Sequence, residues 1–455
     1  MARVKLSDHF TYKRLFRFVL PSIIMMVFVS VYGIVDGFFV SRFVGEMQFA
    51  ALNLIFPFIM ILGAVGFMLG TGGNAVVSKA LGEKDEEKAN RIFSMLIYAS
   101  IVIGVVLAVI GIALARPIAT LFASGERDLS PENRAQLIEH CTLYARVIFI
   151  TLPAFMLQNA FQGFFVTAEK ARLGLYVTII AGLGNVVFDA LFVAVFQWGL
   201  VGAAIATAVN QFIGGLIPII YFSRKNDSLL RLGKTKFDGK VFSRVCYNGM
   251  SEFFTNICLS LVAIIYNAQL MSIVGIMGVS AYGVMQYLGF IFIAVFLGYA
   301  VGSAPIIGYQ YGAQNDKELK NVLKKSLLIS AIGGVVMTLV SCLFARPLSA
   351  IFVGGDQALL DMTTEGMRLY SLCFLGAGLN IFASAFFTAL SNGGVSLLIS
   401  FFRTFLCQAV AVLVLPKLFG LGLNGVWLSA FVAEIITLIL TIWLLVWQRK
   451  RYNYA

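Results

Sequence analysis

The chain contains a succession of apolar runs, each long enough to cross a lipid bilayer as a helix. An α-helix rises about 1.5 Å per residue, so roughly 20 apolar residues cross a hydrocarbon core about 30 Å thick. Of the 455 residues, 60% are hydrophobic and only 12% are charged, whereas an average soluble domain carries about 25% charged residues. Long continuous runs favour helices over barrel strands, so the sequence predicts an all-α polytopic membrane protein.

We expect twelve transmembrane helices. Their approximate ranges are 15–40, 50–74, 92–114, 138–160, 172–196, 200–222, 244–270, 280–306, 322–345, 363–389, 393–415 and 423–447. Most of the 34 Lys and Arg residues fall in alternate loops and at the two termini, and basic loops remain in the cytoplasm. The net charge of +12 therefore indicates membrane topology and not binding to nucleic acid. We expect a multi-pass protein of the plasma membrane, the inner membrane of a bacterium, with both termini cytoplasmic.

The second half of the chain repeats the first at an offset of 230 residues. Residues 115–122, Ala-Arg-Pro-Ile-Ala-Thr-Leu-Phe, align with residues 345–352, Ala-Arg-Pro-Leu-Ser-Ala-Ile-Phe. Three anchors share this offset, the other two being pairs of loop glycines: Gly45 with Gly275, and Gly82 with Gly312. Each half has six spans, an even number, so both halves enter the membrane in the same orientation, related by a pseudo-twofold axis along the membrane normal.

Parallel halves of this kind are one arrangement through which transporters alternate access to a central site. A duplicated structural bundle without transport activity is the alternative. The sequence predicts an N-lobe at 1–222 and a C-lobe at 244–455, each a bundle of six helices. Residues 223–243, polar and rich in basic residues, form the expected cytoplasmic linker.

Charged residues inside the spans are the main candidates for a functional site, because each costs at least ~2.5–3.5 kcal/mol at the centre of a membrane helix. Asp36 lies in span 1 and Asp189 in span 5. Tyr32 and Asn185 each lie four residues earlier on the same helical face, and Thr207 in span 6 adds a hydroxyl. Two carboxylates with nearby oxygens can bind Na⁺ or share a proton. A structural polar cluster or a helix end facing water is the alternative.

The second half lacks a matching pair of carboxylates. Asp36 aligns with Tyr266, and no acidic residue corresponds to Asp189. Glu252 in span 7 is either a second protonatable group or a residue at a cytoplasmic helix end. Arg403 in span 11 is able to pair with Glu434 in span 12, as a structural ion pair or as part of a substrate path. We therefore expect the main cation site in the first half.

Four further residues are candidates for the transport path. Pro21 in span 1 removes a backbone hydrogen bond and favours a kink, so it is a candidate hinge; a tolerated membrane proline is the alternative. Asn159, Gln286 and Tyr287, like Glu252, are candidates to line a substrate cavity, together with Phe and Met side chains that contact flat lipophilic cations well.

These residues together resemble the multidrug and toxic compound extrusion (MATE) family over essentially the whole chain, and more closely its bacterial MepA or DinF-like branches. The resemblance is carried by Pro21 followed by Asp36, by Gly-Asn-Val-Val-Phe-Asp at 184–189 and by Gly-Ala-Ala-Ile-Ala-Thr at 202–207. It implies export of lipophilic, often cationic compounds in exchange for Na⁺ or H⁺. It also implies a cation site at Asp36, Asn185 and Asp189, with Thr207 and Tyr32 as weaker matches.

The nearest rival function is flipping of a lipid-linked sugar or related metabolite, within the same structural superfamily. Such a cavity is expected to be rich in Arg and Lys, which bind pyrophosphate. Arg146 and Arg403 are the only internal bases expected here. No catalytic triad, phosphate-binding glycine loop or ATP-binding motif is present, so we predict a transporter and not an enzyme. We expect it to need no cofactor besides the coupling ion, to function as a monomer and to contact only membrane lipid and small-molecule lipophilic cations.

Overall fold

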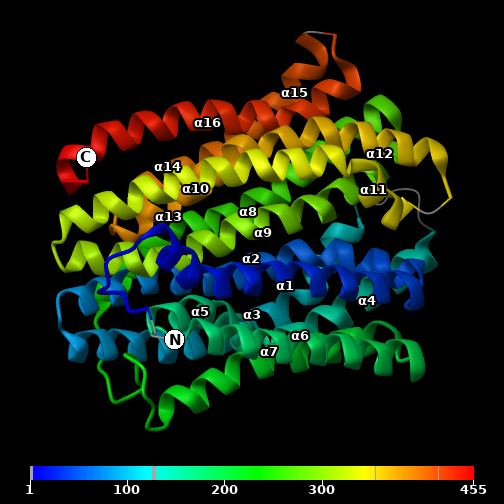
Figure 1. Ribbon diagram of the computed structural model, residues 1–455. Coiled ribbons are helices and arrows are strands. Elements are labelled where there is room, and N and C mark those ends of the chain that lie inside the picture. Colours follow the sequence, from blue (N-terminus) through cyan, green and yellow to red (C-terminus); the bar gives the residue numbers. More distant parts are fainter. Residues whose placement is uncertain (1–3, 125–129, 354, 419, 455) are drawn as a thin grey trace. The chain divides into compact units, whose positions relative to one another are not determined.

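The computed structural model describes residues 4–124, 130–353, 355–418 and 420–454, and these residues fold into α-helices with three short π- or 3₁₀-helical segments and no strand (Figure 1). The helices of the first half are α1 (Tyr12–Phe43), α2 (Glu46–Gly82), α3 (Glu86–Ala123), α4 (Pro131–Ile150), α5 (Leu152–Thr167), α6 (Ala171–Asp189) and α7 (Gly199–Ser223). Those of the second half are α8 (Gly239–Val274), α9 (Ile276–Gly312), α10 (Asp316–Leu343), α11 (Ala345–Val353), α12 (Gln357–Tyr370), α13 (Phe374–Ala389), α14 (Gly393–Phe401), α15 (Cys407–Leu418) and α16 (Gly422–Tyr452).

The predicted all-α membrane fold is confirmed. Among the described residues, eleven helical stretches are long and apolar enough to cross a membrane. The twelfth is the pair α4 and α5, which bend by 56° at Thr151. The single span expected at 138–160 is therefore a bent pair. Pro153 follows the bend directly, and a proline at the start of α5 cannot donate the backbone hydrogen bond that would continue α4.

The helices extend beyond the expected spans, because hydropathy marks only the part buried in lipid. Asp85 caps α3 by accepting a hydrogen bond from the backbone of Lys88, and Asn315 caps α10 by accepting one from Glu318. These two caps lie 230 residues apart, as do Gly45 and Gly275, which adopt positive φ angles of 99° and 72° before α2 and α9. The repeat found in the sequence is thus present in the backbone turns.

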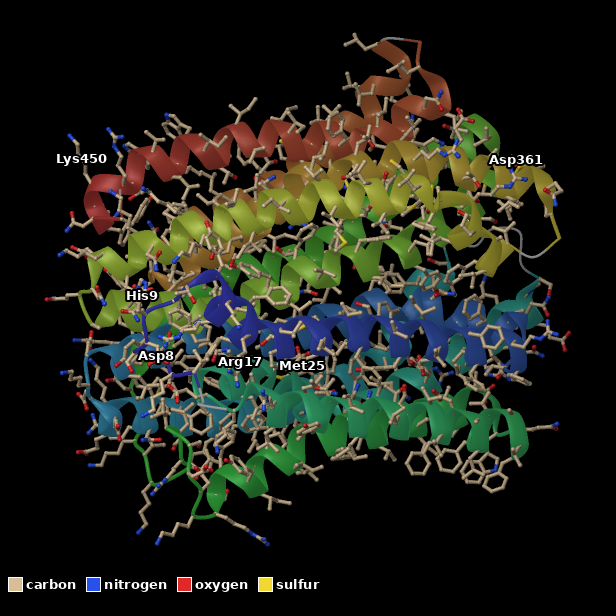
Figure 2. All side chains as sticks on the ribbon, in the orientation of Figure 1. Asp8, His9, Arg17, Met25, Asp361 and Lys450 are labelled. Atoms are coloured by element: carbon tan, nitrogen blue, oxygen red, sulfur yellow. The ribbon has the colours of Figure 1, made fainter. Side chains whose placement is uncertain are left out.

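The chain packs as two compact units, one of residues 28–249 and one of residues 1–27 together with 250–455. The dividing points lie inside α1 and α8, the first helix of each half. Glu318 fixes the N-terminal segment to the rest of the unit that includes residues 250–455. Its carboxylate accepts hydrogen bonds from the backbone of Phe10 and from the side chain of Asn321, each at 2.8 Å. In this unit Asp8, His9 and Lys450 lie at one end and Asp361 lies at the opposite end (Figure 2).

Within the unit of residues 28–249, the beginning of α8 lies against α2 with almost no side chain between the backbones. A Cβ atom built on Gly72 would lie 2.0 Å from the carbonyl oxygen of Val245, and one on Gly249 would lie 1.9 Å from that of Met68. Only glycine permits so close an approach. The corresponding contact in the other unit, 230 residues away, places Gly302 of α9 against Val19 of α1.

Candidate functional site

The two predicted carboxylates meet in the unit of residues 28–249. Asp36 lies in the second half of α1, and Asp189 is the last residue of α6. The carboxylates interact with each other electrostatically, and the amide of Asn185 lies beside Asp36. The backbone changes to a π-helix at Ala190–Val195, directly after Asp189. Such π-helical insertions in α-helices are frequent at functional sites.

The site is buried and its polar atoms are poorly satisfied. Asp189 is fully inaccessible and Asn185 is 1% exposed, whereas Asp36 is half-buried. Among the described residues, no hydrogen-bond partner is present for Oδ1 of Asp36, for either carboxylate oxygen of Asp189 or for Nδ2 of Asn185. Buried polar atoms are almost always paired in proteins, so four unpaired atoms in one place indicate a site that receives a proton or a cation.

Three further polar residues surround the carboxylates, one of which the sequence had predicted. Tyr32 interacts with Asp36 and with Asn210 of α7. Asn210 also accepts a hydrogen bond from Gln158 of α5 at 3.3 Å, and Tyr144 of α4 interacts electrostatically with both carboxylates.

Sequence reasoning missed Tyr144 and Asn210, because neutral polar side chains are common in membrane helices and carry little cost there. The available signal for Asn210 was its position three residues after Thr207 on the same helical face. Thr207 itself is half-buried on α7, and its place in the site stays a prediction.

In the other unit, the position of Asp36 is taken by an aromatic cluster. Tyr266 stacks on Tyr282 with ring centroids 4.7 Å apart, and its hydroxyl is 2.7 Å from that of Ser429. Tyr370 corresponds to Tyr144 in the repeat when a gap of four residues is allowed, which aligns Leu143-Tyr144 with Leu369-Tyr370. It interacts electrostatically with Tyr266 and lies beside Gln286. This cluster is buried and hydrogen-bonded, so it provides no unpaired oxygen comparable with those of Asp189.

The charged residues of this second unit form a separate group. Arg403 donates to Glu434 at 2.8 Å, as the sequence predicted, and Asn380 donates to the other carboxylate oxygen at 2.7 Å. Glu252 is half-buried and within electrostatic range of Arg403. Arg403 lies in a π-helix, Phe402–Leu406, so the fifth span of each half combines a π-helix with a charged residue.

The remaining cavity candidates make local contacts. Asn159 donates to the carbonyl of Phe155 one turn earlier, at 3.0 Å. Gln286 donates to the hydroxyl of Tyr282 at 2.6 Å, whereas the next residue, Tyr287, stacks on Phe352 at 6.2 Å. Their role in a cavity stays a prediction.

Within the described part of the chain, no group of three or more His, Cys, Asp and Glu side chains is arranged to hold a metal ion. The Asp36 and Asp189 site has two carboxylates and would complete a cation shell with neutral oxygens. The side-chain oxygen of Asn185, which lies beside Asp36, is one such ligand, and Na⁺ accepts oxygen ligands of this kind.

Comparison with known proteins agrees with this architecture. The MatE family model matches residues 21–191 and 253–414. The multidrug export protein MepA of Staphylococcus haemolyticus is 24% identical over 456 residues, covering 97% of this chain and 94% of the relative. MepA of Staphylococcus aureus strain NCTC 8325 is also 24% identical, covering 93% and 91%.

A solved structure described as the outward-facing conformation of a multidrug resistance MATE family transporter superposes with a TM-score of 0.88 and 22% identity, covering 100% of this chain and 98% of that one. A crystal structure of MATE in the straight conformation gives a TM-score of 0.89 at 21% identity, covering 98% and 97%. At these identities the two structures confirm the fold alone.

Proposed function

The chain belongs to the MatE family of membrane transporters, and from that premise we propose that it is a secondary active multidrug efflux antiporter. It exports lipophilic, often cationic compounds and takes up H⁺ or Na⁺ in exchange, by alternating access. The proposal is supported by relatives named multidrug export proteins along nearly the whole chain. The abundance of basic residues in alternate loops supports a cytoplasmic location of both termini.

The observation that carries the proposal is the pair of adjacent carboxylates with three unpaired buried oxygens. Two buried carboxylates in contact cannot both stay ionised without a large electrostatic and desolvation cost. Asp36 and Asp189 therefore require a proton or a cation between them. Binding of that ion removes their repulsion and draws α1 towards α6, whereas its release lets the two helices separate.

Ion occupancy reaches the rest of the molecule through α1. Asp36 lies on the part of α1 that packs in one compact unit, and residues up to Val27 pack in the other. Pro21 lies inside α1, on the far side of this division. Because proline removes the hydrogen bond to the carbonyl four residues earlier, α1 bends most easily there. Pro21 is thus the hinge by which movement of Asp36 changes access to the substrate.

Flipping of a lipid-linked sugar is the weaker candidate. A pyrophosphate needs unpaired cationic side chains inside the protein. Arg403, one of the two internal bases expected from the sequence, is already paired with Glu434 and only slightly exposed. The polar atoms left without partners near Asp36 and Asp189 are mainly acidic oxygens, which suit a cation and repel a phosphate.

The proposal is tested by transport in proteoliposomes. Efflux of a fluorescent lipophilic cation is followed under an imposed Na⁺ or H⁺ gradient, for the parent and for Asp36→Asn and Asp189→Asn. Each substitution keeps the shape of the side chain and removes its charge. We expect gradient-driven transport in the parent and its loss in both variants.

Asp227→Asn is the matched control, because Asp227 is an exposed acid in the linker, far along the chain from the site. It should transport like the parent. If both site variants also match the parent, the coupling site is wrong. If the parent moves no cation under either gradient, the antiporter proposal fails and lipid flipping becomes the function to assay.

A further inference from the structure

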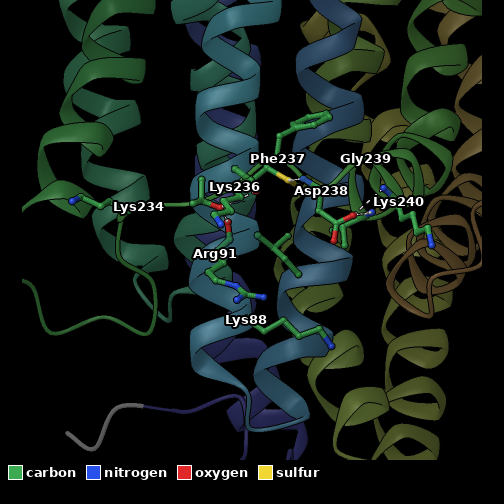
Figure 3. Close-up of a pocket in the computed structure, with 12 residues that line it drawn as sticks. Lys88, Arg91, Lys234, Lys236, Phe237, Asp238, Gly239 and Lys240 are labelled. Atoms are coloured by element: carbon green, nitrogen blue, oxygen red, sulfur yellow. Dashed lines mark hydrogen bonds between the residues drawn. The ribbon is translucent and has the colours of Figure 1, made fainter.

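A basic cavity opens where the beginning of α3, the linker and the beginning of α8 meet, within the unit of residues 28–249 (Figure 3). Its volume is about 1080 Å³. Five of the residues that line it are basic: Lys88, Arg91, Lys234, Lys236 and Lys240. The cavity has no function in the transport proposal, because the cation site is formed by other helices.

The charge of this cavity is largely uncompensated. Lys88 pairs with Glu83 at 2.8 Å, but none of the other four basic residues has an acidic partner within ion-pair distance among the residues the structure describes. The single acid in the lining, Asp238, accepts hydrogen bonds from the backbone of Lys240 and Val241. Its carboxylate is thereby used to cap α8.

The linker is fixed against α3 by several hydrogen bonds, four of which lie beside the cavity. The backbone N–H of Gly233 donates to Ser94 at 3.0 Å, and the hydroxyl of Tyr98 donates to the carbonyl of Gly233 at 3.3 Å. The hydroxyl of Thr235 donates to the carbonyl of Arg91 at 2.9 Å, and the N–H of Asp238 contacts the Met95 sulfur at 3.3 Å. The linker backbone on either side of Lys234 and Lys236 is therefore fixed along α3, so little backbone entropy is lost when an anion binds.

An apolar groove continues directly from the cavity along the membrane helix α3. It has a volume of about 360 Å³ and is lined by Met95, Tyr98, Ala99, Val102, Ile103, Thr235, Phe237 and Phe242. Met95, Thr235 and Phe237 line both the cavity and the groove. From Arg91 to Val102 the helix rises roughly 16 Å, so one face of α3 changes from charged to apolar over about half the thickness of the hydrocarbon core.

We propose that this cavity and groove form a binding site for one anionic glycerophospholipid. Arg91 and Lys236 hold the phosphate of the head group, Lys234 adds to the positive charge of the cavity, and an acyl chain lies along Tyr98 and Val102. Basic pockets beside membrane helices recognise anionic lipid head groups in this way. A soluble phosphate would use the basic cavity and leave the apolar groove without an occupant, so the continuity of the two favours a lipid. The bound lipid fixes the linker to α3 and to the membrane surface.

The first test is native mass spectrometry of the full-length protein, in mild detergent, with added phosphatidylglycerol or phosphatidylcholine of matched acyl chains. We expect one phosphatidylglycerol to be retained and phosphatidylcholine to bind at least about tenfold more weakly. The triple variant Arg91→Gln, Lys234→Gln, Lys236→Gln should lose this preference. The matched control Lys13→Gln, Lys317→Gln, Lys450→Gln removes the same charge from three exposed lysines outside the cavity and should keep it.

The second test separates a lipid from a soluble anion. Val102 and Val109 are each 63% exposed on α3, but only Val102 lines the groove. Val102→Asn should weaken retention of phosphatidylglycerol, whereas Val109→Asn should not, and glycerol phosphate at the same concentration should not displace the lipid. Any one of four results would overturn the proposal. They are equal retention of phosphatidylcholine, an equal loss of preference in the lysine control, equal effects of the two valine substitutions, and displacement of the lipid by glycerol phosphate.

Discussion

The close approach of α2 and α8 at Gly72 gives a prediction with a size set by the structure. A Cβ atom on Gly72 would lie 2.0 Å from the carbonyl oxygen of Val245, and real Cβ atoms do not approach closer than 3.0 Å. Gly72→Ala therefore forces the two backbones apart by about 1 Å. The obstacle is a backbone oxygen and not a flexible side chain, so it cannot be avoided by a change of rotamer.

Overpacking of this kind costs typically about 1–3 kcal/mol. Gly72→Ala therefore stabilises a local opening of the beginning of α8 from α2 by that amount relative to the closed state, a shift of roughly 5- to 150-fold in population. The expected result is faster backbone hydrogen exchange at residues 239–249 and a lower melting temperature.

Gly283→Ala is the control, because Gly283 lies inside α9 and no atom lies within 4 Å of a Cβ built on it. It should leave exchange and melting unchanged or slightly improved, since alanine favours helix. Gly302→Ala should be milder than Gly72→Ala, because its nearest obstacle is the side chain of Val19 at 2.9 Å. If Gly72→Ala exchanges and melts like the parent, the reasoning from the backbone approach is refuted.

Three further predictions concern the ion pairs and the N-terminal anchor. Glu318→Gln should accelerate hydrogen exchange of residues 4–11, because the buried carboxylate accepts hydrogen bonds from that segment; unchanged exchange would contradict this. Arg403→Gln should destabilise the protein in thermal denaturation by about 3–5 kcal/mol, because the buried Glu434 charge loses its cationic partner and keeps only the hydrogen bond from Asn380. Adding Glu434→Gln should recover part of the loss, whereas additive losses would count against coupling. Lys170 holds the pKa of Asp227, in the linker, below its usual range. The ion pair therefore stabilises the linker fully at pH values above about 3.9, the pKa of an unfolded Asp, and this stabilisation is lost as the pH falls through the lowered pKa of the folded state. Protection of residues 224–230 against exchange, relative to the intrinsic rate at each pH, should therefore fall in acid in the parent, and in Asp227→Asn it should be lower without that dependence.

The fold was predictable because its dominant constraint, the cost of leaving backbone groups unpaired in lipid, is visible in the sequence as apolar length. What hydropathy could not show is where helices continue into water. The span expected at 280–306 is part of a helix of 37 residues, Ile276–Gly312, whose ends are set by turn glycines and caps. The repeat also concealed a difference: α3 continues through Pro117, whereas its counterpart breaks at Phe344 before Pro347 and forms α11.

The candidate site was predictable to the extent that its residues are charged. Asp36 and Asp189 stood out because ionised groups are rare in membrane helices, and the structure brings them together with Asn185. Tyr144 has no comparable signal, because tyrosine is ordinary in such helices. Spacing in the sequence also does not show direction: Gln286 and Tyr287 are neighbours, yet they contact different aromatic residues, since successive helical residues point about 100° apart.

The two halves share a backbone plan but differ at the equivalent position, and this difference bears on how an exchanger can work. In one unit, Asp36 and Tyr144 belong to a group with unpaired acidic oxygens. In the other, their counterparts Tyr266 and Tyr370 belong to a packed, hydrogen-bonded aromatic cluster. In the proposed exchange, the unpaired acidic oxygens of the first group gain stabilising interactions when a cation arrives, and a ligand shifts a conformational equilibrium only by its differential interaction with the two states. The entering ion of that proposal acts directly on the unit of residues 28–249, and α1 and α8, whose residues are divided between the two units, connect it to the other unit.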